Sequence, residues 1–309
     1  MTATALTIGT RGSALAVAQT ELIAAALVAQ HPALQVNLVR ITTTGDRILD
    51  QPLTDIGGKG LFVAEIEEAL REGRIDLAVH SAKDLPTDLP EDLALAAIPA
   101  RADARDVLVS RDGTTLDALP PGSRIGTSSP RRTCQIAARR PDLHAIAIRG
   151  NVDTRLRKLA QGEFDALVLA AAGLIRLGRT EAITEWLSPE VMLPAVGQGA
   201  LALQVRAGDT ATQALLEPLG DRNTAVAVSA ERAFLRALGA GCSAAAGASA
   251  RLDGDALRIE GLIGSADGRL VRGHGRGPVA DAEALGTMLA MELLDRGGRR
   301  FLAEASGPG

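Results

Sequence analysis

Residues 73–85 are GRIDLAVHSAKDL and residues 162–174 are GEFDALVLAAAGL, and the two stretches align without a gap. Each contains a mostly apolar run of the kind that forms a short buried strand. A second pair, IGTRGSALAVAQ at 8–19 and IGTSSPRRTCQ at 125–135, predicts a strand, a Gly-Thr turn and a helix in each case. Strands that alternate with helices indicate parallel sheets, so the sequence predicts two similar α/β lobes in tandem. The alternative is a chance recurrence of common strand sequences.

The segments around the first copy fit the same fold class. Residues 44–60 are polar, contain Gly and lack periodicity, which predicts a long loop, and loops of that length are often functional. The expected strands cover residues 4–8, 36–44 and 74–81, and the expected helices cover about 13–30 and 61–73.

The pattern changes near residue 222. A predicted helix is followed by three short strands separated by Asp-Gly turns, which favour hairpins, and then by a final helix over about 280–296. This order indicates a small α+β domain at the C-terminal end.

Composition excludes several classes of protein. The net charge is −4 and aromatic residues make up 2% of the chain, which argues against a nucleic-acid partner. No leader-like segment and no long apolar run is present, so we expect neither secretion nor a membrane span. Two cysteines form no disulfide framework, which favours a reducing cytoplasm, and the four scattered histidines predict no metal site.

The two copies differ in a way that suggests chemistry. Lys83 and Asp84 of the first copy fall opposite Ala172 and Gly173 of the second. Two lobes of this class would enclose a cleft, where a carboxylate can act as a general acid or base. The alternative is an ordinary charged pair in a surface turn.

Polar and basic side chains follow the predicted strands of both lobes. Ligands of open α/β sheets lie at the carboxyl ends of strands, where helix N-termini and Arg side chains bind anions. These positions therefore predict a ligand with several negative charges, and the alternative is a set of solvated arginines. The residues are Arg11, Ser13, Thr127, Ser128, Ser129, Arg131, Arg132, Arg149, Gly150, Arg155 and Arg176.

The cysteines carry little local signal. Cys242 lies in LGAGCSAAAG, and a Cys among small residues is more often a buried small hydrophobe than a nucleophile. Cys134 lies in a predicted helix with apolar neighbours, and we expect it to be a packing residue.

Together, an ordered set of segments resembles the porphobilinogen deaminase family. It runs from residue 8 to about 247, and the last 60 or so residues add little. The segments are IGTRGSALAVAQ, TTGD, GGKGLF, DLAVHSAKDLP at 76–86, RIGTSSPRR at 124–132, IRGNVDTRLRKL at 148–159, LPAVGQGALAL at 193–203 and SAERAFLRALGAGC at 229–242.

The resemblance implies a fold and an activity. It implies two lobes like those of type II periplasmic binding proteins, formed by residues 1–99 with about 200–217 and by 100–199, and a C-terminal domain over 222–309. It also implies a transferase of tetrapyrrole (porphyrin and haem) biosynthesis that is cytoplasmic and monomeric. Four porphobilinogen molecules would be joined head to tail with loss of ammonia, and water would then release hydroxymethylbilane. The growing chain would be built on a dipyrromethane cofactor attached to Cys242 as a thioether.

The resemblance also assigns roles to residues. Asp84 would be the catalytic carboxylate, because it can stabilise the positive charge left on the pyrrole when ammonia leaves. Lys59 and Phe62 would belong to an active-site lid. Cofactor contacts are implied for Lys83, Asp84, Thr127, Ser128, Ser129, Arg131, Arg132, Gly150 and Arg155. Substrate contacts are implied for Arg11, Ser13, Gln19, Arg149, Arg176 and Gln198.

Three positions depart from the family's usual pattern. Ala245 stands where Pro is usual, Ala240 where Gly is common, and Asp55 where a basic residue can occur. We expect altered loop stiffness or charge at these positions. The main alternative function is a non-catalytic, two-lobed binding protein for a small polycarboxylate or oxyanion.

Overall fold

The computed structural model of the chain describes residues 5–47, 63–239 and 244–306. The chain divides into two compact units. The first unit contains Met1–Arg101 and Ala200–Ala225, and the second contains Ala102–Gly199 and Val226–Gly309.

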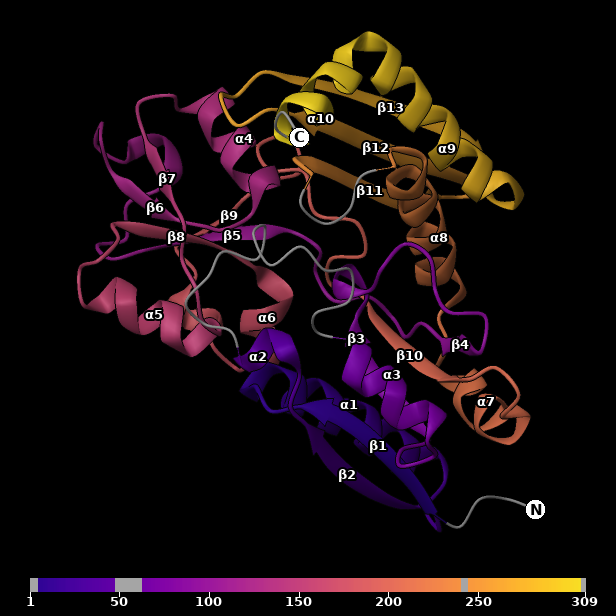
Figure 1. The fold of residues 1–309 in the computed structure, drawn as a ribbon. Helices are drawn as coiled ribbons and strands as arrows, with labels where there is room; N and C mark the ends of the chain where they lie inside the picture. Colours follow the sequence, from indigo (N-terminus) through magenta and orange to yellow (C-terminus); the bar gives the residue numbers. More distant parts are fainter. Residues whose placement is uncertain (1–4, 48–62, 240–243, 307–309) are drawn as a thin grey trace. The chain divides into compact units, whose positions relative to one another are not determined.

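The described part of the first unit has one sheet in the strand order β2-β1-β3-β10-β4 (Figure 1). Strands β2 and β3 pair parallel with β1, whereas β10 pairs antiparallel with β3 and β4. Leu6, Ile8, Ile23, Leu27 and Leu203 are buried in its core. The strands are β1 (Ala5–Arg11), β2 (Gln35–Ile41), β3 (Leu77–Ser81), β4 (Leu93–Ala97) and β10 (Leu201–Arg206). The helices are α1 (Ala14–Gln30), α2 (Thr44–Arg47), α3 (Ala64–Arg71) and α7 (Thr210–Leu216), with short 3-10 turns η1 (Ala82–Asp84) and η4 (Glu217–Leu219).

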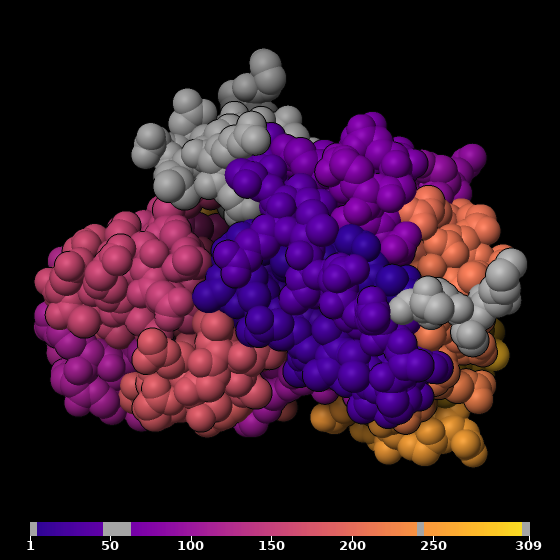
Figure 2. Space-filling view, turned by 90° about the horizontal axis from the view of Figure 1, so that it is seen from below, coloured from indigo at the N-terminus to yellow at the C-terminus, as the bar shows by residue number. Residues whose placement is uncertain are grey.

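One face of the first unit is built from α1 and the edge strand β2, whose residues are coloured indigo in Figure 2. Leu22, Val28 and Leu38 are the large apolar side chains exposed on these elements. Scattered exposed apolar side chains are normal on protein surfaces. The predicted site residues of this unit lie instead at the carboxyl ends of β1 and β3, and inside α1.

The second unit has a sheet with the order β7-β6-β8-β5-β9 within its described residues. Strands β7 and β8 pair parallel with β6, and β5 pairs antiparallel with β8 and β9. The strands are β5 (Asp106–Ser110), β6 (Arg124–Gly126), β7 (His144–Ile146), β8 (Ala166–Ala170) and β9 (Glu185–Trp186). The helices are α4 (Pro130–Arg139), α5 (Val152–Ala160) and α6 (Ala171–Arg176), with 3-10 turns η2 (Leu116–Ala118) and η3 (Thr180–Ala182).

The two sheets repeat one pattern down to their register. Ile8 pairs with Leu77 in the first sheet, and Ile125 pairs with Ala166 in the second. The Asp residue before each central strand, β3 or β8, accepts an equivalent hydrogen bond. Asp76 accepts from the Thr7 amide at 3.0 Å, and Asp165 accepts from the Arg124 amide at 2.8 Å. The ungapped alignment of 73–85 with 162–174 therefore reflects a structural repeat, and the prediction of two similar α/β lobes is confirmed.

The rest of the second unit is a three-stranded antiparallel sheet with helices, as predicted for a small α+β part. Phe234 on α8 packs with Ile259, Leu285 and Leu289 in its core. The elements are α8 (Arg222–Ala237), β11 (Ala246–Asp253), β12 (Ala256–Gly264), β13 (Leu270–Pro278), η5 (Val279–Asp281), α9 (Ala282–Leu293), η6 (Leu294–Gly298) and α10 (Arg299–Ser306).

Two local predictions were wrong. Residues 44–47 form the short helix α2 rather than loop, because the Thr44 amide and hydroxyl both donate to Glu65 Oε1, at 2.8 and 2.5 Å. The final predicted helix ends early at Leu293, and after the turn η6 the chain continues as α10. Gly297, with φ at +117°, supplies the conformation that this turn requires.

Gly286 on α9 allows close contact with α8, which yields a test of the packing. A Cβ at this position would lie 2.1 Å from the Ala230 carbonyl oxygen of α8. We expect Gly286→Ala to lower the free energy of unfolding by about 2–3 kcal/mol, since overpacking outweighs the gain in helix propensity. Urea denaturation measures this, with Gly208→Ala as control because a Cβ there meets nothing within 4 Å. Equal stability of the two variants would contradict the packing.

Candidate active site

The turn from β1 to α1 places two predicted residues of the first unit. Arg11 ends β1, and Ser13 caps α1, its hydroxyl oxygen accepting a hydrogen bond from the Ala16 amide at 3.3 Å. The first turn of α1 holds no acidic residue, so its positive dipole end is not neutralised there. This turn is therefore suited to an anionic group.

Lys83 and Asp84 lie in the 3-10 turn η1, directly after β3. Their neighbours Ala82 and Leu85 are both 3% exposed and anchor the turn in the core. Asp84 itself is exposed and Lys83 is half-buried. The turn thus holds a carboxylate at a fixed position where a ligand can reach it.

Gln19 is engaged inside the first unit. It is 4% exposed, and its Nε2 donates to Ser81 Oγ at 3.0 Å. This contact joins α1 to the end of β3, so Gln19 helps to fix the strand end that precedes η1.

A buried polar chain in the first unit was missed by sequence reasoning. His80 Nε2 lies 2.9 Å from Gln204 Oε1, and Gln204 Nε2 donates to Glu67 Oε1 at 2.9 Å. Burial, with a smaller effect from the positive charge of Arg11, lowers the pKa of His80 to about 4, although the hydrogen bond with Gln204 opposes the shift. The imidazole is therefore neutral near pH 7. A His within the apolar run LAVHS was the only sequence signal for it.

The turn between β6 and α4 organises three predicted residues of the second unit. Thr127 Oγ1 accepts from the Ser129 amide at 3.2 Å, and Ser128 Oγ both donates to the Ile148 carbonyl and accepts from its amide. Ser129 is the N-cap residue of α4, but its hydroxyl makes no capping bond. That hydroxyl lies at a helix N-terminus, a position that favours anions.

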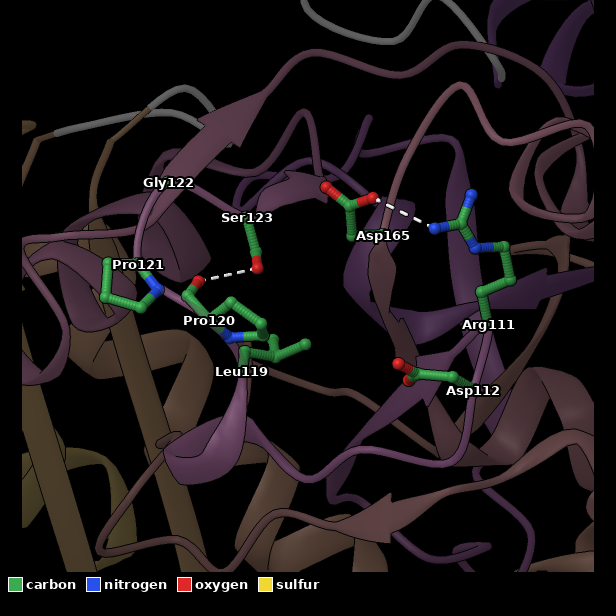
Figure 3. Close-up of a pocket in the computed structure, with 8 residues that line it drawn as sticks. All are labelled: Arg111, Asp112, Leu119, Pro120, Pro121, Gly122, Ser123 and Asp165. Atoms are coloured by element: carbon green, nitrogen blue, oxygen red, sulfur yellow. Dashed lines mark hydrogen bonds and ion pairs between the residues drawn. The ribbon is translucent and has the colours of Figure 1, made fainter.

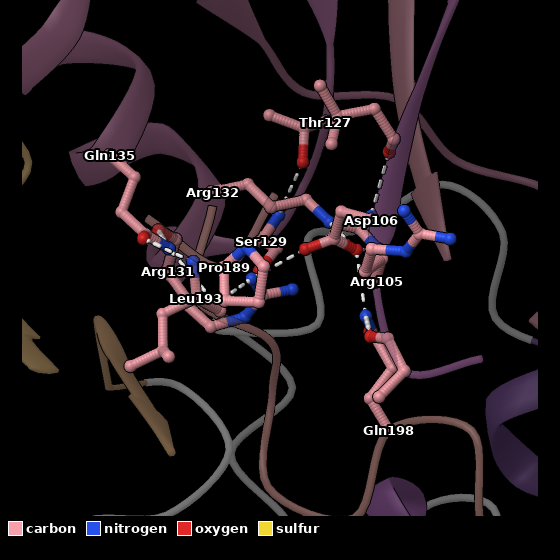
Figure 4. A network of polar contacts seen from close by, with 12 residues as sticks. Arg105, Asp106, Thr127, Ser129, Arg131, Arg132, Gln135, Pro189, Leu193 and Gln198 are labelled. Carbon is pink, nitrogen blue, oxygen red and sulfur yellow. Dashed lines mark hydrogen bonds and ion pairs between the residues drawn. The ribbon is translucent and has the colours of Figure 1, made fainter. Parts of the chain in front are cut away.

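Arg131 and Arg132 converge on the carboxylate of Asp106, a residue that sequence reasoning did not single out (Figure 4). Arg131 Nη1 lies 2.7 Å from Oδ2, and Arg132 Nη2 lies 2.7 Å from Oδ1. Asp106 is fully buried, and the two guanidiniums hold its pKa well below the usual range despite the opposing effect of burial. Gln198, predicted to touch substrate, is also buried and donates to Oδ1 at 2.9 Å.

Further guanidiniums lie near this pair. Arg155 Nε donates to the Gly150 carbonyl at 2.8 Å. Burial lowers the pKa of Arg155 to about 10, with further lowering by the charges of Arg132 and Arg149. Among the described residues, Arg132 therefore belongs both to the pair that Asp106 neutralises in part and to a group of positive charges with Arg149 and Arg155.

Arg176 stands at the end of α6, where its Nη2 donates to the Gly199 carbonyl at 2.7 Å. Burial lowers its pKa to about 10, so it also keeps its charge near neutral pH.

A separate cavity of about 280 Å³ in the second unit holds none of the predicted residues (Figure 3). Its walls include the Arg111–Asp165 ion pair, 3.6 Å apart, and Ser123, whose hydroxyl donates to the Pro120 carbonyl at 2.6 Å. The remaining lining residues are Asp112, Leu119, Pro121 and Gly122.

Three predicted residues, Lys59, Phe62 and Cys242, lie outside the described residues, as do Asp55 and Ala240. After Cys242 in sequence, Ala245 is buried, and its carbonyl accepts from the Gly264 amide at 2.8 Å. Gly247 lies against Arg131, since a Cβ there would be 2.9 Å from Arg131 Cδ. Strand β11, which follows Cys242 in the sequence, therefore packs on Arg131.

Cys134 is a packing residue, as predicted. It is fully buried beside Leu193, Ala245 and Leu262, and burial raises the pKa of its thiol to about 12. A thiol of that pKa is a poor nucleophile at neutral pH.

Two further observations concern the described ranges only. No helix in them is long and apolar enough to cross a membrane. No group of His, Cys, Asp and Glu side chains in them could hold a metal ion.

The buried His80 predicts a pH dependence of stability. The unfolded chain binds a proton near the ordinary pKa of 6.5, whereas the folded chain resists protonation down to about pH 4. The contribution of His80 to the free energy of unfolding is therefore complete above pH 6.5 and is lost as the pH falls from 6.5 toward 4. We expect the free energy of unfolding to fall by about 2 kcal/mol between pH 7 and pH 5. Urea denaturation of His80→Gln should show a smaller loss than the wild type. The exposed His144→Gln is the control, and a wild-type-like loss in His80→Gln would refute the assignment.

Comparisons with known proteins identify the family of the chain. The family model "Porphobilinogen deaminase, dipyromethane cofactor binding domain" matches residues 6–214, and "Porphobilinogen deaminase, C-terminal domain" matches residues 225–295. The chain is 59% identical to the porphobilinogen deaminase of Roseiflexus castenholzii, over 96% of this chain and 98% of that protein. It is 54% identical to the porphobilinogen deaminase of Syntrophotalea carbinolica, over 98% of this chain and 96% of that protein.

Similarity to solved structures is weaker. The periplasmic VFT2 domain of Bordetella pertussis BvgS is 16% identical, with a TM-score of 0.42 over 69% of this chain and 85% of that one. A periplasmic binding protein from Salmonella typhimurium is 14% identical, with a TM-score of 0.41 over 70% of this chain and 92% of that one. The two family models and the full-length relatives decide the assignment instead: the chain belongs to the porphobilinogen deaminase family.

Proposed function

We propose that this chain joins four porphobilinogen molecules head to tail on a dipyrromethane carried by Cys242, with loss of ammonia, and releases hydroxymethylbilane by hydrolysis. The observation that carries the proposal is the group of buried guanidiniums in the second unit: Arg131 and Arg132 pair with Asp106, and Arg155 lies within the electrostatic influence of Arg132 and Arg149. Porphobilinogen and the pyrroles made from it carry acetate and propionate groups. Guanidiniums bind such carboxylates in two-pronged fashion.

The donor groups present fit a dipyrromethane. An arginine has five N–H donors, and Arg131 uses two, both on Nη1, for Asp106 and for the Leu193 carbonyl. Its Nε is buried and has no partner among the described residues. Buried N–H groups in native proteins nearly always have an acceptor, so Arg131 is ready to bind one more anionic oxygen. When bound, the dipyrromethane supplies the pyrrole carbon that attacks the first substrate molecule.

We assign the binding roles by charge and position. Lys83, Ser129, Arg131, Arg132 and Arg155 hold cofactor carboxylates. Thr127, Ser128 and Gly150 shape the turns that present them. A second group, Arg11, Ser13, Arg149 and Arg176, meets the incoming substrate or the growing chain.

Asp84 is proposed to be the catalytic carboxylate. It is exposed on an anchored turn, so it can approach the pyrrole N–H of a bound substrate. There it stabilises the positive charge that develops as ammonia leaves, and it can pass on the proton that is lost after the new carbon–carbon bond forms. Lys59 and Phe62 are assigned to a lid.

We further propose three domains: a first α/β lobe over 1–99 and about 200–217, a second α/β lobe over 100–199, and a C-terminal domain over 222–309. The proposed enzyme acts as a monomer in the cytoplasm. The substrate is porphobilinogen, and neither nucleic acid nor membrane takes part.

The intact mass of the denatured chain tests covalent attachment. We expect the wild type to exceed its sequence mass by two linked pyrrole units, and Cys242→Ser to show no excess. Cys134→Ala is the matched control and should keep the excess, because that thiol is buried and protonated. A wild-type chain that gains no mass even after addition of porphobilinogen would overturn the proposal.

Replacement of the carboxylate tests the role of Asp84. Asp84→Ala should lower kcat by about a hundredfold or more, the usual scale for a lost general acid–base group. Its melting temperature should stay near that of the wild type, because the side chain is exposed. Glu91→Ala, an exposed carboxylate seven residues on, serves as the control. Turnover of Asp84→Ala within a few-fold of wild type would exclude the catalytic role.

A further inference from the structure

Asp106 stands where the structural repeat predicts an apolar residue. In the second unit Asp106 pairs with Ala170 across β5 and β8, and in the first unit Leu201 pairs with Ser81 across β10 and β3. Ser81 and Ala170 are equivalent in the ungapped alignment of the two copies. Asp106 therefore takes the place of Leu201, which is 3% exposed. The same sheet position accepts a buried leucine, so the fold itself does not require a carboxylate there.

The carboxylate of Asp106 is not available to a ligand. Oδ1 accepts from Arg132 Nε at 3.1 Å, from Arg132 Nη2 at 2.7 Å and from Gln198 Nε2 at 2.9 Å. Oδ2 accepts from Arg131 Nη1 at 2.7 Å. Three of these donors share Oδ1 and one is on Oδ2, so most of the acceptor positions of the carboxylate are occupied. Because Asp106 is also fully buried, substrate cannot reach it, and the two guanidiniums keep it ionised during turnover.

The contacts with Asp106 determine which N–H groups of Arg131 and Arg132 remain for a ligand. Arg131 Nη1 is held between Asp106 and the Leu193 carbonyl, and Arg132 Nη1 donates to the Val168 carbonyl at 2.8 Å. Arg131 is thereby held through Nη1 alone, whereas Arg132 is held through all three of its guanidinium nitrogens. The remaining N–H groups point in directions set before any ligand arrives. Preorganised donors bind an anion without the cost of ordering long side chains.

We propose that Asp106 is a positioning residue that orients Arg131 and Arg132 for the carboxylates of the dipyrromethane cofactor. The inference rests on the proposed function, since it assumes that these arginines bind the cofactor. Asp106 also offsets one of the two positive charges, which lets the pair be buried in the absence of ligand. Buried ion pairs add little to stability relative to apolar residues, so stability alone does not account for replacing the leucine.

The rate of cofactor loading tests the proposal. The full-length chain is produced without cofactor in a host that makes no porphobilinogen, and the gain of mass is followed at 25 °C after porphobilinogen is added. Asp106→Glu keeps the charge but displaces the carboxylate by about one methylene, and Asp106→Asn keeps the shape but loses the charge. We expect both variants to load at least about tenfold more slowly than the wild type while remaining folded by circular dichroism.

Asp103→Asn is the matched control. Asp103 pairs with Arg105 at 2.7 Å in the same segment but lies outside the network of Asp106, and it should load within twofold of the wild type. A folded Asp106→Glu that loads at the wild-type rate would show that only the charge matters and would overturn the positioning role. If the wild type itself gains no mass, the proposed function fails as well, so the two failures are distinguishable.

A measurement on the wild type covers the case in which neither variant folds. In the chain without cofactor, the Arg132 Nε–H should exchange slowly with water by ¹⁵N NMR, because Asp106 already accepts from it. Arg132→Lys assigns the resonance, and the exposed Arg157 gives the reference for fast exchange. Fast exchange of Arg132 Nε–H before loading would overturn the proposal.

Discussion

The arginine pair of the second unit depends on one buried carboxylate, that of Asp106, which accepts four hydrogen bonds. Asp106 joins the start of β5 to two consecutive residues of α4 and to Gln198, which lies 92 positions away in the chain. A buried carboxylate costs free energy unless it is paired and hydrogen-bonded, and here it has two guanidinium partners and both of its oxygens accept hydrogen bonds. In return it allows two guanidiniums to be buried side by side. The positive charge of Arg131 and Arg132 can therefore be buried in this unit because the negative charge of Asp106 lies between them.

The two lobes share a fold and divide the polar residues between them. Their sheets have the same strand order, the same register and the same Asp contact before the central strand. Two of their differences replace apolar or small residues with charge: the first copy has Lys83 and Asp84 where the second has Ala172 and Gly173, and the second has Asp106 where the first has Leu201. A position that is apolar or small in one lobe but charged in the other is informative about function, because the fold does not require the charge. Comparison within one chain therefore locates both special positions.

The local sequence predicted the strands and the positions of the arginines, but it did not predict contacts between residues far apart in the chain. The register of β3 and β8 could be predicted because their apolar runs and flanking Gly and Asp residues coincide. The arginines could be predicted because they follow strand ends. Asp106 could not, because its partners lie 25, 26 and 92 residues away and its side chain resembles a loop residue in sequence. His80 was missed for the same reason, since its partner Gln204 lies on β10, 124 positions further on.

The choice of arginine over lysine in the second unit follows from burial. Burial lowers the pKa values of Arg155 and Arg176 to about 10, and both side chains remain charged at pH 7. A lysine starts from a lower ordinary pKa, near 10.4, so the same burial would bring its pKa closer to neutral pH. A neighbouring guanidinium such as Arg149 would lower it further, toward neutrality. Guanidiniums therefore keep their positive charge when buried near one another, and they can bind a ligand that carries several carboxylates.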